Sequence, residues 1–297
     1  MSLTLFGHKN CKGSSVQINR NYSDLKDTSL NYRASSARLS SSGDTAIFYK
    51  ETSYRGEAMF RSGNKTIENL GDPGDGGKNG FNNKVKSVRI TPYRMKVKYH
   101  FMYKEGELPG DHDGVLGMLT IAQHINELHE VAAEIWEPYM VELEKETLLG
   151  FYNSSKYFEV DLTTGEEVQL QSDPIAEFAN WRVDVVFVED VISQKEKDNP
   201  GTNTTGWGGS PITDPMVILE LRPESLTFTN GRAIAHEIGH ICGLGHGSND
   251  NPNRLMTQAG QISSSLTDAV KLSQSEAETV HTELANNDVS RPLLRLE

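Results

Sequence analysis

The chain has 297 residues, of which 36% are hydrophobic, and this is enough apolar material for two hydrophobic cores. Its formal net charge of −12 argues against nucleic acid and anionic membranes as partners, because both repel an acidic protein at long range. No stretch approaches the roughly 18 consecutive apolar residues of a membrane-spanning helix, so no membrane insertion is expected. Proteins, peptides and small molecules remain as partners.

Residues 1–92 predict an all-β domain that contains an internal repeat. An aromatic residue, four variable positions, Cys or Tyr, one variable position and Gly occur at 6–13 and again at 49–56. The segment NYRASS at 31–36 likewise recurs as NNKVKS at 82–87. Two copies of about forty residues are each too small to bury a sheet face alone, so they predict two Greek keys packed as one sandwich.

This repeat resembles the βγ-crystallin family, in which each copy carries an aromatic hairpin and a calcium-binding segment. The family holds calcium with oxygens from both segments, in keeping with the six to eight oxygen ligands that this ion takes. The resemblance implies calcium ligation by matching residues of the two segments, namely Asn31, Ser35, Asn82 and Asn83. Tyr32 and Lys86 depart from the pattern, which implies one weak site and one lost site. The alternative is that these Asn and Ser residues only form turns.

Residues 93–297 predict a second domain of mixed α and β structure. Residues 94–103 alternate as a strand, and apolar residues at spacings of three and four between Ile121 and Tyr139 predict a long helix. His124 and His129 lie five residues apart on that helix, so they cannot share a metal and are expected to be exposed. A final helix is predicted to begin near Ser273. The expected fold class is therefore α+β, with the sandwich followed by a mixed-sheet domain.

The segment HEIGHICGLGH, which begins at His236, carries the most chemistry in the chain. His236 and His240 lie one helical turn apart, so their imidazoles can converge on one ion. Gly243 can take the left-handed conformation that ends a helix, which lets the chain present His246 as a third ligand. Three neutral nitrogens suit zinc and leave one position for water, as in catalytic sites. Glu237 is placed to take a proton from that water and pass it to the leaving amine.

The same segment resembles the metzincin metallopeptidases, in which a methionine turn follows beneath the zinc. Met256 stands ten residues past His246, and Gly247-Ser248 fits the matrixin-like branch. The resemblance spans roughly residues 93–297, although only this core is specific. It implies a zinc-dependent endopeptidase that acts on a protein or peptide, with a strand edge that grips the substrate backbone. Residues 202–210 are the candidate for that edge, and an ordinary glycine-rich loop is the alternative.

Two other functions stay open at this point. One is a calcium-binding structural or adhesion protein with an inactive peptidase fold. The other is a peptidase toxin delivered by a secretion machine, whose partners would include that machinery or a proteinaceous inhibitor. The first thirteen residues have no apolar core of signal-peptide length, so no signal peptide is expected. Localisation is left open, with secretion or delivery outside the cell as the expectation for such a peptidase.

Overall fold

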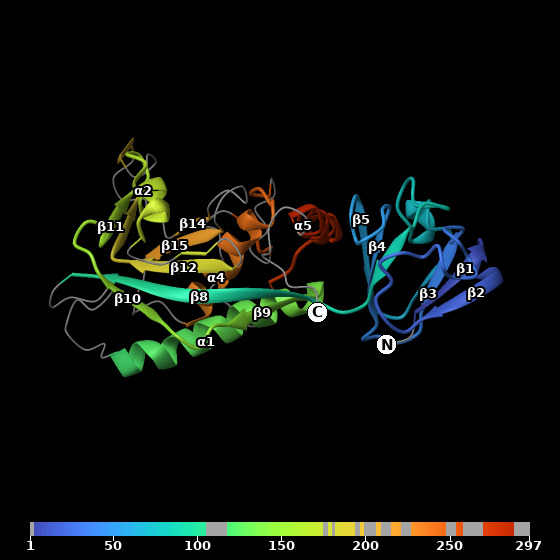
Figure 1. Ribbon diagram of the computed structural model, residues 1–297, viewed down its shortest axis with the longest axis horizontal. Coiled ribbons are helices and arrows are strands. Elements are labelled where there is room, and N and C mark those ends of the chain that lie inside the picture. Colours follow the sequence, from blue (N-terminus) through green and yellow to red (C-terminus); the bar gives the residue numbers. More distant parts are fainter. Residues whose placement is uncertain are drawn as a thin grey trace. The chain divides into compact units, whose positions relative to one another are not determined.

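The computed structural model describes most of the chain, and the ten described ranges are 3–104, 118–174, 178–179, 182–193, 197–198, 206–208, 215–220, 227–247, 254–257 and 270–287. The chain divides into two compact units (Figure 1). The first unit comprises residues 1–92 and 274–290, and the second comprises residues 93–273 and 291–297. Among the described residues, no helix is both long enough and apolar enough to cross a membrane.

The first unit is built from two antiparallel sheets. One has the strand order β2-β1-β3-β6 and the other has the order β5-β4-β7. The strands are β1 (Leu3–His8), β2 (Lys12–Ile18), β3 (Ser36–Leu39), β4 (Thr45–Tyr49), β5 (Ala58–Ser62), β6 (Lys65–Ile67) and β7 (Ser87–Arg89), with a 3-10 turn η1 (Pro73–Asp75) before β7. Fully buried aliphatic and aromatic side chains from both sheets form one hydrophobic core between them.

Each repeat contributes one segment to the sheet that is formed mainly by the other repeat. Strand β6 comes from the second repeat but pairs with β3 of the first. Tyr22 comes from the first repeat but forms a bridge with Val88 of β7. This exchange closes two Greek keys into one sandwich, so the double Greek-key arrangement that the internal repeat predicts is present.

Helix α5 (Gln274–Asn287) belongs to the first unit and packs against β5. The Arg61 guanidinium donates to the Glu278 carboxylate at 2.6 Å, and the Ala58 N–H donates to the Thr282 hydroxyl at 3.1 Å. The sequence division at residue 92 assigns this helix to the second domain. In the structure α5 belongs to the first unit instead, because these two hydrogen bonds join it to strand β5, which lies more than 200 residues earlier in the chain.

The second unit is organised around one mixed sheet with the strand order β10-β8-β12-β15-β14. Strand β9 also pairs with β8, over its first half. All neighbours are parallel except β14, which runs antiparallel to β15. The strands are β8 (Tyr93–Tyr103), β9 (Val141–Lys145), β10 (Gly150–Asn153), β12 (Val183–Val188), β14 (Gly206–Gly208) and β15 (Met216–Glu220). A separate parallel pair is formed by β11 (Glu159–Asp161) and β13 (Asp190–Ile192), with helix α2 (Glu166–Ser172) beside β11.

Two long helices of this unit, α1 (Met118–Trp136) and α4 (Thr227–Ile241), pack against each other. The buried Trp136 indole N–H donates to the Ala235 carbonyl at 3.2 Å. The predicted long helix ends at Trp136 because Pro138 disfavours α conformation in the residue before it, and the chain continues as a 3-10 turn η2 (Glu137–Tyr139). Helix α4 carries the histidine-rich segment, so this packing fixes the helix on which the candidate site is built.

Candidate metal centre

Three histidines converge at the end of α4. The Nε2 atom of His246 lies 3.3 Å from the Nε2 atoms of both His236 and His240. One ligand nitrogen from each residue can be chosen so that all three lie within 4.8 Å of one another. Nitrogens that share a tetrahedral zinc at about 2.0 to 2.1 Å are separated by about 3.3 Å. The spacing therefore fits a small tetrahedral ion.

Backbone carbonyls fix the tautomer of two of these histidines. His236 donates from Nδ1 to the Leu255 carbonyl at 2.7 Å, and His240 donates from Nδ1 to the Leu244 carbonyl at 2.7 Å. A carbonyl only accepts, so each Nδ1 carries the proton and each Nε2 keeps a free lone pair. Burial lowers the pKa of His236 to about 4 and also lowers the pKa of His240. Both rings are thus neutral at pH 7, which is the form that binds a metal.

The turn after α4 brings His246 back toward the other two. Gly243 has a φ of 81°, in the left-handed region that a residue without Cβ adopts freely. Its N–H bonds to the His240 carbonyl at 2.9 Å, and the Leu244 N–H bonds to the Gly239 carbonyl at 2.9 Å. This pair of bonds is a Schellman motif, which ends the helix and reverses the chain.

Met256 lies against the underside of the same helix. Its side chain is fully buried, and its Sδ atom is 2.5 Å from where a Cβ on Gly239 would stand. The Gly247 N–H also donates to the Met256 carbonyl at 2.9 Å. His236 donates to the carbonyl of Leu255, the residue before Met256, so the turn that contains both residues helps to fix the histidine cluster.

Glu237 lies between α4 and the edge strand β14. The side chain is only 8% exposed, and the Gly208 N–H donates a hydrogen bond to its carboxylate. Burial raises the pKa of Glu237 to about 8, with that hydrogen bond acting in the opposite direction. A cation held by the three histidines would lower this pKa by favouring the carboxylate. The group is therefore suited to hold and release a proton near neutral pH.

The four calcium candidates are only partly brought together. Ser35 donates from Oγ to Asn83 Oδ1 at 3.0 Å, which joins the first segment to the second. Asn82 lies next to Asn83 in the chain, and its buried Oδ1 has no hydrogen-bond partner among the described residues. Asn31 has a φ of 40°, and its backbone N–H bonds to the Thr28 carbonyl at 3.1 Å. No described hydrogen bond joins Asn31 to the other three.

The repeat places Tyr32 and Lys86 at the positions equivalent to Asn83 and Ser35. The Tyr32 hydroxyl donates to Asp24 Oδ1 at 2.5 Å. That hydrogen bond is the main cause of a lowered pKa for the Asp24 carboxyl, and the charge of Lys86 contributes in the same direction. One pair of equivalent positions, each pair taking one residue from either copy, thus has a phenol bonded to a carboxylate and an ammonium where the other pair has Ser35 and Asn83, so the two candidate calcium positions are chemically different.

His129 differs from its sequence-based expectation, because it is 9% exposed rather than solvent-facing. The Tyr99 hydroxyl bonds to His129 Nδ1 at 2.8 Å, and His129 Nε2 donates to the Leu143 carbonyl at 3.1 Å. The ring therefore fills a polar position between α1 and the strands β8 and β9. The expectation was wrong because the apolar stripe of α1 is wide enough to include this position.

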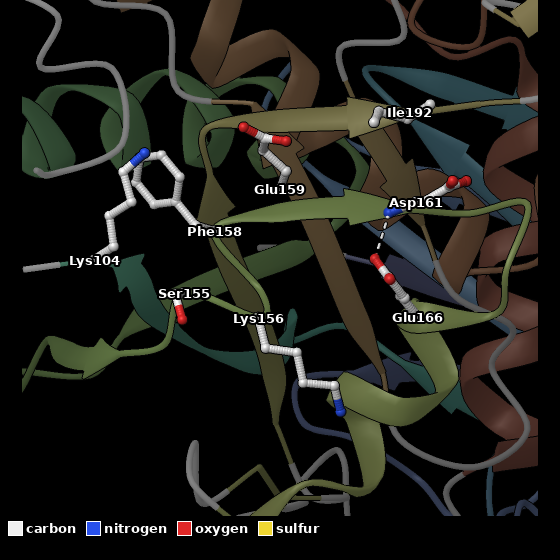
Figure 2. A pocket seen from close by; sticks show the side chains of 8 residues that line it. All are labelled: Lys104, Ser155, Lys156, Phe158, Glu159, Asp161, Glu166 and Ile192. Carbon is white, nitrogen blue, oxygen red and sulfur yellow. Dashed lines mark hydrogen bonds between the residues drawn. The ribbon is translucent and has the colours of Figure 1, made fainter.

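A cavity of about 290 Å³ opens near β11 and α2, and Figure 2 shows its lining. Eight residues line it, namely Lys104, Ser155, Lys156, Phe158, Glu159, Asp161, Glu166 and Ile192. Several of them already interact with neighbours. Glu166 accepts from the Asp161 N–H at 2.9 Å, and Lys197 forms an ion pair with the Asp161 carboxylate at 2.7 Å. None of the three clustered histidines lines this cavity, so it is separate from the metal centre.

Sequence reasoning missed the contact between Glu237 and the glycines of β14. The predicted substrate edge at 202–210 has only residues 206–208 inside the described part of the chain. The available signal was the alternation of glycine in Gly206-Trp207-Gly208, since glycine inside a strand often marks the close approach of another backbone.

No protein-family model and no curated protein matches this sequence. Among solved structures, a βγ-crystallin from Ciona intestinalis is 21% identical, with a TM-score of 0.27, and the match covers 31% of this chain and 100% of that one. The N-terminal domain of protein S is 26% identical, with a TM-score of 0.25 and coverages of 30% and 94%. A βγ-crystallin domain from Flavobacterium johnsoniae is 25% identical, with a TM-score of 0.24 and coverages of 30% and 91%. Each of these three matches covers about 30% of this chain.

Proposed function

We propose that this chain is a zinc-dependent endopeptidase. The observation that carries the proposal is the convergence of three imidazole Nε2 atoms, with His246 at 3.3 Å from each of the other two. His236, His240 and His246 would hold the ion, and Glu237 would serve as the general base. When bound in such a site, zinc polarises a peptide carbonyl and lowers the pKa of water to about 7.

The surrounding residues support this assignment through their own chemistry. The Nδ1 bonds to Leu255 and Leu244 orient two rings before any metal arrives, which reduces the entropy that binding would cost. Glu237 lies next to the first ligand, and its buried carboxyl can accept a proton and later donate it to the leaving amine. Among the described strands, only β15 pairs with β14, so the second edge of β14 is a candidate for pairing with an extended peptide.

Removing the metal is expected to abolish hydrolysis of casein by the full chain. The chain should bind one zinc, and a chelator followed by added zinc should first remove and then restore activity. A variant with Ala at positions 236, 240 and 246 should contain no zinc at this site and show no hydrolysis, because all three nitrogen ligands are lost. Unchanged zinc content in that variant would rule out the three-histidine site, and chelator-resistant hydrolysis would rule out a metallopeptidase.

Calcium binding by the first unit is a second candidate function. It is favoured by the Ser35–Asn83 hydrogen bond, which brings oxygens of both segments together, and by the buried Oδ1 of Asn82, which has no partner in the part of the chain that the structure describes. Calcium takes oxygen ligands of this kind, whereas the Lys86 ammonium stands at the position equivalent to Ser35 and repels a cation there. One site rather than two is therefore proposed.

Millimolar calcium is expected to raise the melting temperature of the first unit, because a ligand that binds only the folded state stabilises it. The full chain is the appropriate sample, since α5 belongs to this unit. Calorimetry compares the parent with the Asn83→Ala variant, which lacks one proposed calcium ligand, and so tests this site in particular. The shift should be present in the parent and absent in the variant. The site would be ruled out if calcium left the melting temperature of the parent unchanged, or if it shifted the melting temperatures of both proteins equally.

A further inference from the structure

The edge strand β14 presents two glycines on the side that faces Glu237. The strand pairs with β15 in the register Gly206↔Leu219, Trp207↔Ile218 and Gly208↔Val217. Successive side chains point to opposite faces of a sheet, so the two glycines share one face and Trp207 occupies the other. Trp207 packs there against a hydrophobic cluster that includes Ile218. The face toward α4 therefore carries no side chain from β14.

Side chains on that face would collide with Glu237. A Cβ on Gly206 would stand 2.9 Å from Glu237 Oε1 and 2.5 Å from a terminal methyl carbon of Leu219. A Cβ on Gly208 would stand 3.0 Å from Glu237 Oε2 and 2.7 Å from the Glu237 carbonyl oxygen. The two carboxylate oxygens thus each meet one glycine. The Gly208 N–H also donates to the carboxylate, so the strand both confines it and bonds to it.

We propose that β14 is a positioning element for Glu237, and that glycine at 206 and 208 lets the strand backbone hold the carboxylate in its working place. The inference rests on the proposed function, in which Glu237 is the general base. A displacement of about 1 Å in a catalytic group can lower a rate about 100-fold, so the position of a strand whose two glycines face the carboxylate would affect the reaction rate.

Replacing each of the two glycines with alanine would affect a different part of the surrounding structure. At Gly206, the three described atoms nearest to an added methyl group belong to the ends of two side chains, Leu219 and Glu237. At Gly208, it meets the backbone of α4 and comes within 3.0 Å of the Cβ of His240. Gly206→Ala is therefore expected to displace the carboxylate with little effect on the helix, whereas Gly208→Ala is also expected to push the strand away from the helix that bears the ligands.

The test compares Gly206→Ala with Gly43→Ala, a control whose added methyl group meets nothing within 4 Å. Gly206→Ala is expected to keep its zinc and to lower kcat about 10-fold to 100-fold, with KM changed less than about threefold. Gly208→Ala should lose at least as much activity. Gly43→Ala should match the parent. Zinc content, kcat and KM are measured on each full-length protein.

A double-mutant cycle separates positioning from general packing. In a Glu237→Asp background the shorter carboxylate no longer reaches position 206, so adding Gly206→Ala should change the residual kcat less than about twofold. Equal losses in the two backgrounds would show a packing role and overturn the proposal. A zinc-loaded Gly206→Ala protein with parental kcat would also overturn it, while the proposed function would stand. A parent without zinc-dependent hydrolysis would overturn both.

Discussion

Replacing Glu237 with Gln is expected to lower kcat at least about 100-fold, because general acid–base catalysis typically contributes 10² to 10⁴ in rate. The same carboxyl group would take the proton from the attacking water and return it to the leaving amine, so both transfers are affected. Gln has nearly the same volume as Glu and keeps one carbonyl oxygen that can accept from the Gly208 N–H. The fold, the zinc content and KM should therefore stay near their parental values.

The matched control is Glu130→Gln, which makes the same chemical change at an exposed position of α1. It should behave as the parent in zinc content and in hydrolysis. A zinc-loaded Glu237→Gln protein that retains more than about a tenth of the parental kcat would contradict the assigned role, since the loss would lie below the range for a general base. Loss of zinc in this variant would instead mean that the carboxylate supports the metal site.

Glu278→Gln is expected to destabilise the first unit by about 3 kcal/mol, because removing one member of a buried ion pair leaves its partner charged and desolvated. The Glu278 carboxylate lies 2.6 Å from the Arg61 guanidinium and 2.9 Å from the Lys78 ammonium. The side chain of Arg61 is 5% exposed and that of Glu278 is 11% exposed, so water screens this pair little. Lys78 is more accessible, which places the expected loss at the lower end of the range for buried pairs.

The control for this variant is Glu142→Gln, which breaks the Arg94–Glu142 pair, where both side chains are about half exposed. Exposed pairs contribute roughly 0 to 1 kcal/mol, so that loss should be several times smaller. Urea denaturation followed by circular dichroism measures both changes on the full chain. Equal destabilisation by the two substitutions would show that the α5 contact is as weakly coupled to the fold as a surface pair.

The double Greek key was predictable because its information is local and repeated. The two copies at 6–36 and 49–87 each show the hairpin pattern and the polar segment, and the fold follows from pairing two such units. The candidate metal centre was predictable because its motif is also local in the sequence. His236 and His240 stand one turn apart on one helix, with Glu237 next to the first, and helical geometry alone brings the two imidazoles to one side.

The remaining features depend on contacts between distant segments, which sequence patterns do not encode. The association of α5 with β5 pairs Arg61 with Glu278, 217 positions apart, and nothing in either local pattern identifies the other. The burial of His129 depends on the Tyr99 hydroxyl of a neighbouring strand. The contact of Gly206 with Glu237 is of the same kind, although the alternating glycines of β14 hint at a close neighbour.

The chain leaves the first unit after Pro92 and re-enters it at Gln274, so residues 93–273 are inserted between two segments of the first unit. A single proteolytic cut between residues 93 and 273 would therefore yield two fragments that are still joined non-covalently, since the C-terminal fragment retains α5 and its contacts with β5. Closing so long a loop costs only slightly more entropy than closing a short one, because the cost grows with the logarithm of its length. A nicked molecule of this protein should thus migrate as one species under native conditions and as two only after denaturation.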